Sequence, residues 1–168
     1  WLGRIAIMAA TGVLVINLGY GFDGTFSALS TATLDPEGTL RTNLNGTLHL
    51  LESLRRRQLR PRVLVIGSAD EYGLSADAPE PLLEDTPLRP NSPYAVSKVA
   101  QGYLAYQYAL SFGIPIVRTR TFPHTGPGRG ELFAESSFAK QPAETERSPA
   151  RPVIEVGNLE AVRDFTDV

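Results

Sequence analysis

Three polar side chains in the middle of the chain have the types and the spacing needed for proton transfer. Tyr94 and Lys98 are four residues apart at the start of an expected helix, so both side chains share one face. A tyrosine has a reference pKa of about 10 and needs a neighbouring cation to act as an acid or base near neutral pH. We expect Lys98 to supply that charge and to lower the pKa of Tyr94. Ser68 ends an expected strand, where its hydroxyl can hydrogen-bond a substrate oxygen.

The pair Tyr-x-x-x-Lys is weak evidence by itself, because on most helices it is a surface pair. The sequence around this pair favours a catalytic role. Ser92-Pro93 caps the helix directly before Tyr94, an expected strand ends at Ser68, and another strand follows about 16 residues after Lys98.

The elements that must position these side chains alternate between strand and helix. Short β-branched runs predict buried strands at 12–18, 62–67 and 114–118. Capped segments with apolar periodicity predict helices over 35–57 and 93–112. This order is typical of a parallel sheet covered by helices, and ligands bind outside the carboxyl ends of such strands. The predicted fold class is therefore α/β, part of a Rossmann-type doubly wound parallel sheet.

The composition argues against several classes of function. Lys plus Arg total 16 and Asp plus Glu total 18, so the net charge of −2 disfavours a nucleic-acid or membrane-surface partner. The sequence has no cysteine, which removes disulfides, thiolate metal sites and a cysteine nucleophile. We expect no metal, and a cytoplasmic location. The apolar run from Ile5 to Ile16 is too short to span a bilayer and is interpreted as buried strand.

Five stretches of the sequence form an ordered set of motifs. They are residues 35–47, from Asp-Pro-Glu-Gly-Thr to Asn-Leu-Asn-Gly-Thr; 67–73, Gly-Ser-Ala-Asp-Glu-Tyr-Gly; 92–98, Ser-Pro-Tyr-Ala-Val-Ser-Lys; 118–128, Arg-Thr-Arg-Thr-Phe-Pro-His-Thr-Gly-Pro-Gly; and 157–168, Gly-Asn-Leu-Glu-Ala-Val-Arg-Asp-Phe-Thr-Asp-Val. Together they resemble the extended short-chain dehydrogenase/reductases of the NAD-dependent epimerase/dehydratase family. Within it they are most similar to the branch of GDP-mannose 4,6-dehydratases and GDP-4-keto-6-deoxymannose reductases.

The resemblance implies catalytic roles for residues of the first three stretches. Tyr94 would be the acid/base, Lys98 would lower its pKa and hold the nicotinamide ribose, and Ser68 would bind the sugar 4-oxygen. Asn43 matches the helix asparagine that supports the surroundings of this lysine, with a packing role as an equal alternative. Asp70 stands where the dehydratases carry an acidic residue, usually Glu, and a solvated loop carboxylate is its equal alternative.

The resemblance also implies binding roles. His124 and Arg129 match positions that contact the cofactor, although a structural histidine is an equal alternative for His124. Arg163 matches an arginine that holds the nucleotide diphosphate, a role that suits a planar, always-charged donor.

The implied cofactor is NADP or NAD, and the implied substrate is a nucleotide sugar, a GDP-linked deoxyhexose. A 4-reductase transfers hydride to the keto carbon while Tyr94 protonates the oxygen; a 4,6-dehydratase first removes hydride at C4, then loses water across C5 and C6. The Asp-Glu-Tyr-Gly form of residues 70–73 favours the reductases. An epimerase is less expected, because the similar epimerases use a Cys/His pair. The two predicted helices are expected to build a homodimer interface.

Less regular segments complete the expected organisation. Residues 73–93 are expected to be loop, 131–141 a short helix and 153–156 a short strand. By resemblance, residues 1–121 are a partial NAD(P)-binding Rossmann domain, and residues 122–168 begin a small substrate-binding region.

Two departures from the family qualify these expectations. Gly19, Gly21 and Gly24 spell G-x-G-x-x-G, but only ten residues separate Gly24 from Asp35, too few for the first crossover helix and the next strands. We therefore expect a fragment that lacks the opening half of the nucleotide-binding domain and the C-terminal end, with a shortened fingerprint as the alternative. Pro123 stands where the family usually has an asparagine that orients the sugar. The alternative function is a catalytically inactive remnant that associates with a partner.

Overall fold

The computed structural model describes residues 13–16, 35–77, 81–131, 133–147, 153–157, 160, 162 and 164–167. Contacts between residues divide the chain into two compact units. The described residues up to Thr121 belong to the first unit, and those from Phe122 onward belong to the second.

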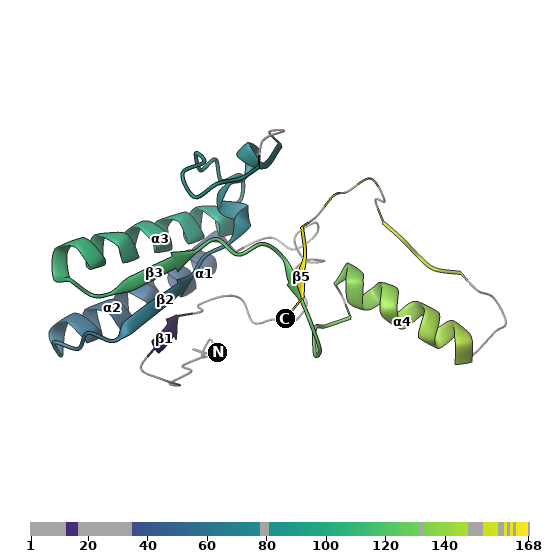
Figure 1. Cartoon of the computed structure of the whole chain (residues 1–168), viewed down its shortest axis with the longest axis horizontal. Coiled ribbons are helices and arrows are strands. Elements are labelled where there is room, and N and C mark those ends of the chain that lie inside the picture. Colours follow the sequence, from purple (N-terminus) through teal and green to yellow (C-terminus); the bar gives the residue numbers. More distant parts are fainter. Residues whose placement is uncertain are drawn as a thin grey trace. The chain divides into compact units, whose positions relative to one another are not determined.

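A three-stranded parallel sheet forms the centre of the first unit. Its strands are β1 (Val13–Ile16), β2 (Arg62–Ile66) and β3 (Ile116–Thr119), in the order β1-β2-β3. In register, Val15 lies opposite Leu64, and Leu64 lies opposite Val117. The three strands expected from the sequence are confirmed, and their carboxyl ends meet at one edge of the sheet (Figure 1).

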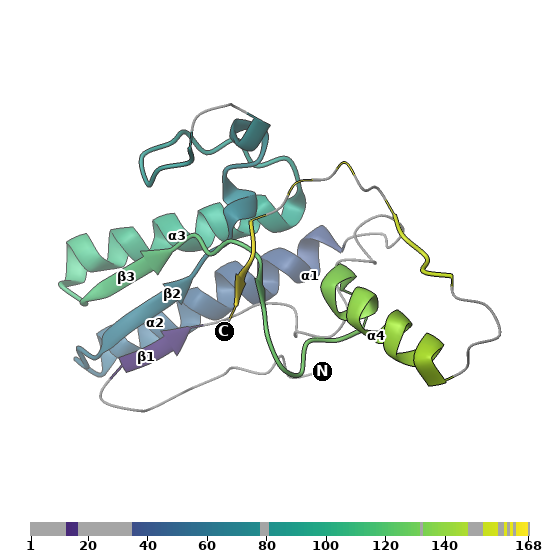
Figure 2. The same ribbon diagram turned by 45° about the vertical axis from the view of Figure 1, so that its right-hand side comes forward.

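Helices between the strands pack side by side over one face of this sheet (Figures 1 and 2). The first helical segment comprises α1 (Pro36–Leu40), a π-helical turn η1 (Arg41–Asn45) and α2 (Gly46–Arg56). The second is α3 (Pro93–Phe112). Both expected helices are confirmed, but the sequence did not indicate the π turn in the first one.

Local capping explains where these helices begin and end. The Asp35 side chain accepts the Gly38 amide at 2.9 Å, and the Ser92 hydroxyl accepts the Ala95 amide at 3.1 Å. Gly113 ends α3 with a φ of 63°, in the left-handed region that favours glycine. The cap-then-proline signals in the sequence therefore correctly marked both helix starts.

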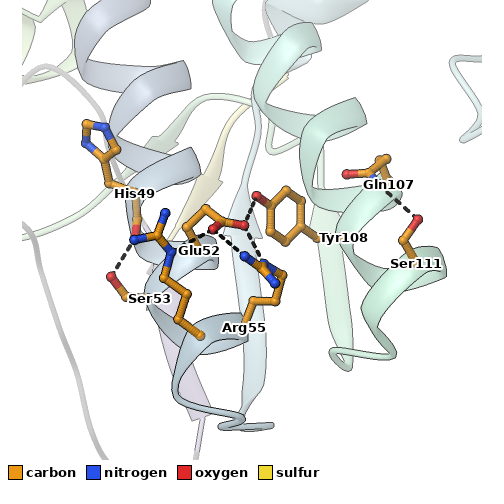
Figure 3. Close-up of polar contacts among 8 residues, drawn as sticks. His49, Glu52, Ser53, Arg55, Gln107, Tyr108 and Ser111 are labelled. Atoms are coloured by element: carbon orange, nitrogen blue, oxygen red, sulfur yellow. Dashed lines mark hydrogen bonds and ion pairs between the residues drawn. The ribbon is translucent and has the colours of Figure 1, made fainter.

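Apolar side chains from both helical segments and from the strands form one core. Its buried members are Leu51, Leu54, Val63, Val65, Ala105, Tyr108 and Ile114. Next to this core, α2 and α3 are joined by Glu52, whose carboxylate accepts the Tyr108 hydroxyl at 2.7 Å and the Arg55 Nε at 2.6 Å (Figure 3). The core fixes the position of α3, the helix that carries Tyr94 and Lys98.

The connection from β2 to α3 contains two short 3-10 helices, η2 (Ala69–Glu71) and η3 (Leu74–Asp77). The expected loop 73–93 therefore includes one turn of 3-10 helix. Gly73 forms an isolated parallel bridge with Arg89 at a φ of 50°. An added Cβ at Gly73 would overlap the Arg89 carbonyl, so the turn requires glycine here.

The second unit contains the helix α4 (Ala134–Arg147) and a short parallel pair, β4 (His124–Thr125) with β5 (Thr166–Asp167). The helix begins later than expected and continues past Pro142. The short strand expected at 153–156 is wrong, because these residues form no strand. Instead, the Gln141 side-chain amide bonds both backbone groups of Glu155, at 2.6 and 3.0 Å. Among the described residues, no helix is both long and apolar enough to cross a membrane.

Candidate active site

Ser68 lies directly beyond the carboxyl end of β2 and caps the 3-10 helix η2. Its hydroxyl accepts the Asp70 amide at 3.2 Å, and its own amide donates to the Glu71 carboxylate at 2.9 Å. These two bonds form a capping box, which satisfies the amides at the start of the turn. The turn thereby holds the Ser68 hydroxyl at the edge of the sheet where ligands bind in open α/β folds.

Tyr94 lies in the first turn of α3, and the Ser68 side chain lies near enough to its phenol to lower the phenol's pKa. The Asp70 carboxylate is close enough to act on the phenol electrostatically. The structure thus brings together three of the residues singled out from the sequence, although they come from two segments separated by the long 73–93 connection.

The environment of Tyr94 keeps its phenol protonated. Burial raises the pKa of Tyr94 to about 12; the Ser68 side chain opposes the rise, while the charges of Asp70 and Glu71 add to it. At neutral pH, only about one phenol in 10⁵ is then ionised. The expectation that the pKa of Tyr94 is lowered is therefore wrong for this structure, because burial and two carboxylates raise it.

Lys98 lies one turn beyond Tyr94 and is 1% exposed. Its amine donates to the Ile66 carbonyl at 3.0 Å and lies 5.8 Å from the centroid of the Tyr94 ring. Burial lowers the pKa of Lys98 to about 8, and the charge of Glu71 opposes that fall. The expected shared face is confirmed, and the bond to β2 anchors this face to the sheet.

Asn43 is fully buried in the π turn η1 and connects it to α3. Its side-chain amide donates to the Ser97 hydroxyl at 2.8 Å, and that hydroxyl donates to the Tyr94 carbonyl at 2.6 Å. One turn further, Gln101 donates to Thr47 at 2.8 Å. These buried contacts hold the helix segment that carries Tyr94 and Lys98, so Asn43 packs against the site rather than facing solvent.

Glu71 and Arg120 form a pair. Both residues lie within the motifs, but the sequence indicated no role for either. Glu71 is 3% exposed, and its carboxylate accepts the Arg120 Nε at 3.3 Å. Arg120 follows β3, just as Ser68 follows β2. That shared position at neighbouring strand ends was the signal that could have found the pair.

The remaining candidate residues lie in the second unit. His124 is in β4, with its Nδ1 3.4 Å from the Phe122 carbonyl oxygen. Arg129 donates to the His124 carbonyl, pairs with Glu135 and stacks 3.8 Å from the centroid of the Phe133 ring. The Pro123 carbonyl accepts the Thr166 amide at 2.9 Å. Arg163, and the three glycines at 19, 21 and 24, lie outside the described residues.

The arrangement in the first unit can hold an oxygen and protonate it. The protonated Tyr94 phenol and the Ser68 hydroxyl lie near each other, so both can reach one substrate oxygen. A buried lysine one turn away adds a donor whose charge is sensitive to pH near neutrality. These groups come from the ends of neighbouring elements, where the backbone positions them without a flexible linker.

Comparison with known proteins places this geometry in a family. Residues 15–168 match the family model described as GDP-mannose 4,6 dehydratase. A GDP-6-deoxy-D-mannose reductase from Pseudomonas aeruginosa is 40% identical over 134 residues, which cover 80% of this chain and 44% of the relative. A GDP-mannose 4,6-dehydratase from Vibrio cholerae is 31% identical over 144 residues, covering 84% of this chain and 38% of the relative. The chain thus spans less than half the length of these curated relatives.

Solved structures agree with this placement. The structure of RMD from Pseudomonas aeruginosa complexed with NADPH matches with a TM-score of 0.80 at 35% identity, covering 93% of this chain and 52% of that one. A dTDP-glucose 4,6-dehydratase from Bacillus anthracis in complex with NAD matches with a TM-score of 0.57 at 27% identity, covering 62% and 33%. These likenesses confirm the Rossmann-type α/β fold and the family resemblance inferred from the motifs.

Proposed function

We propose a function from one premise, that this chain belongs to the GDP-mannose 4,6 dehydratase family. We infer that it is part of an NAD(P)-dependent nucleotide-sugar oxidoreductase of the GDP-4-keto-6-deoxymannose reductase type. The observation that carries the proposal is that Ser68, Tyr94 and the buried Lys98 lie together at the carboxyl edge of the sheet.

In this function Tyr94 is the general acid. Ser68 holds the sugar 4-oxygen, and Tyr94 gives that oxygen its proton as negative charge develops there. A phenol with a pKa of about 12 is fully protonated at neutral pH, yet it is a much stronger acid than the alcohol that forms. The proton therefore moves downhill during reduction.

Some of the residues present are suited to bind the dinucleotide that this function requires. The Lys98 amine and the Tyr94 hydroxyl are suitable donors for ribose hydroxyls, and the Lys98 amine is already held in place by the Ile66 carbonyl. His124 and Arg129 are proposed as further cofactor contacts, and Arg163 as a contact to the nucleotide diphosphate. When bound, the nicotinamide supplies the hydride.

Reduction is favoured over dehydration by the Asp-Glu-Tyr-Gly form of residues 70–73 and by the 40% identity with a GDP-6-deoxy-D-mannose reductase. A dehydratase must first oxidise C4, which needs a base to accept the hydroxyl proton, whereas a reductase uses Tyr94 as an acid. Asp70 is the residue proposed to take the C5 proton if dehydration does occur. The charge of Asp70 acts on Tyr94, so Asp70 lies close to the proposed acid.

The proposal is tested by supplying the two substrates separately. With GDP-4-keto-6-deoxymannose, a reductase consumes NADPH, which is followed by absorbance at 340 nm. With GDP-mannose, a dehydratase forms the keto sugar with no net consumption of cofactor, which is followed by chromatography. In the full-length protein we expect only the first reaction, and we expect Tyr94→Phe to abolish it. A full-length protein inactive with both substrates would contradict the enzyme proposal and favour an inactive remnant.

The proposed assembly is a homodimer built on α2 and α3, in the cytoplasm. Tyr103, Tyr106 and Leu110 are exposed on α3, and Leu110 is 68% exposed, so this helix presents apolar surface that a second copy could cover. In the same proposal, the unit ending at Thr121 binds the dinucleotide, and the residues from Phe122 begin the substrate region. Light scattering gives the oligomeric state, and a monomer at micromolar concentration would exclude the dimer.

A further inference from the structure

Glu71 is a buried carboxylate to which the chemistry proposed above gives no task. It is 3% exposed, although an ionisable side chain is rarely this buried unless it is paired. Its Oε1 accepts the Ser68 amide at 2.9 Å, and its Oε2 accepts the Arg120 Nε at 3.3 Å. Both oxygens therefore have charge-assisted or backbone donors, which favour the ionised form.

Gly67 makes room for this carboxylate, and Gly102 lies beside it. A Cβ at Gly67, at the end of β2, would overlap Glu71 Oε1 and the Thr119 carbonyl. A Cβ at Gly102, in α3, would lie 3.9 Å from Glu71 Oε2. The cradle is thus built from β2, α3 and the residue after β3, three elements that meet at the proposed active site.

Charged and titratable groups face Glu71 from each of these elements. Arg120 approaches from the end of β3, and Lys98 and Tyr94 approach from α3. Asp70 is its neighbour within η2. Burial raises the pKa of Glu71, while the Ser68 amide, Arg120 and Lys98 oppose that rise. In return, the charge of Glu71 raises the pKa of Lys98 against the effect of burial.

The Arg120 side chain also contacts residues 81–91, which belong to the connection that leads into α3. Its Nη1 donates to the Glu84 carbonyl at 2.7 Å, and its guanidinium lies 5.4 Å from the centroid of the Tyr72 ring. The Tyr72 hydroxyl in turn donates to the Leu83 carbonyl at 3.0 Å. The same guanidinium therefore holds both Glu71 and the segment that leads into α3.

We propose that Glu71, held by Arg120, is a positioning residue of the active site: it fixes the backbone of Ser68 and places a buried negative charge opposite Lys98. The effect of Glu71 on catalysis rests on the proposed function. Its effects on the charge of Lys98 and on the position of Ser68 do not. Removing the charge should leave Lys98 easier to deprotonate. It should also loosen Ser68 relative to Tyr94.

The decisive measurement is the titration of Lys98, which needs neither substrate nor cofactor. The chain has only two lysines, Lys98 and Lys140, so ¹³C-lysine labelling gives two side-chain NMR signals that Lys140→Arg assigns. We expect Glu71→Gln to lower the Lys98 midpoint relative to that of the wild type and to leave Lys140 unchanged. An unmoved Lys98 midpoint in the folded variant overturns the proposal.

Glu84→Gln is the matched control, because it makes the same change on an exposed side chain whose backbone contacts Arg120. It should leave the Lys98 midpoint where it is. If both variants move the midpoint equally, the effect is one of overall charge, and the proposal fails.

A second variant covers the case in which Glu71→Gln does not fold, since its amide would face the Arg120 donor. The double change Glu71→Gln with Arg120→Gln restores a donor–acceptor pair without charge, and its Lys98 midpoint should lie below that of Arg120→Gln alone.

In the reductase assay, we expect Glu71→Gln to lower kcat roughly ten- to a hundredfold with little change in KM. A wild-type chain without activity would overturn the proposed function, whereas the Lys98 titration would still decide this inference. An active wild type with unchanged kcat in Glu71→Gln would contradict the positioning role.

Discussion

Adding one methyl group at Gly67 and at Gly102 gives a matched pair of perturbations, because both methyl groups point toward the Glu71 carboxylate. At Gly67 the new Cβ would overlap the Thr119 carbonyl oxygen as well as Glu71 Oε1. The carboxylate can rotate away, but the Thr119 carbonyl belongs to the backbone of β3 and cannot. At Gly102 the nearest atom is 3.9 Å away, an ordinary contact distance.

The two substitutions are expected to change the free energy of unfolding in opposite directions. Overpacking at Gly67 costs about 1–3 kcal/mol, and losing the Ser68–Glu71 hydrogen bond to a charged group adds about 1.5–3 kcal/mol if the carboxylate turns away. Gly102 lies inside α3, where Gly→Ala stabilises a helix by about 0.5–1 kcal/mol. We therefore expect the two variants to differ by about 1.5–7 kcal/mol in free energy of unfolding.

Urea unfolding followed by circular dichroism measures this difference, with equal m-values as the check that both variants unfold from comparable states. For a domain of this size, each kcal/mol corresponds to about 2–4 °C in Tm. Gly67→Ala as stable as Gly102→Ala would refute the reasoning, because it would mean that β2, β3 and Glu71 are not packed as closely as the structure places them.

Three further predictions concern the site and its support. Tyr94→Phe keeps the packing but removes the transferable proton, so turnover should be lost while dinucleotide binding stays within a few-fold; substantial residual activity would remove Tyr94 from the chemical step. Pro123→Asn should strengthen nucleotide-sugar binding in calorimetry by restoring an amide side chain, and unchanged binding would mean that this position does not contact the sugar. Hydrogen bonds from Arg55 and Tyr108 lower the pKa of Glu52 from 4.5 to about 2, so its contribution to stability is present above pH 4.5 and is lost as the pH falls toward 2. Acid unfolding of Glu52→Gln should lack that contribution, and an identical pH dependence in both proteins would contradict the role of the α2–α3 contact in Figure 3.

Local chemistry explains which elements were predictable from the sequence. The caps at Asp35 and Ser92 and the stop at Gly113 act within four residues, so the helix ends could be identified without knowing the rest of the fold. The strand at 153–156 was predicted from its β-branched residues alone. It did not form because a strand needs a partner, and the Gln141 side chain occupies the Glu155 backbone groups instead.

The sequence by itself determined that Tyr94 and Lys98 share a helix face and that Ser68 stands at a strand end, because both follow from residue spacing. Only the tertiary structure decided how these groups ionise. The Lys98 amine finds its acceptor 32 residues away at Ile66, and Arg120 reaches Glu71 across 49 residues. A pKa depends on burial and on every charge nearby in space, so a neighbour four residues away could not settle that Tyr94 stays protonated.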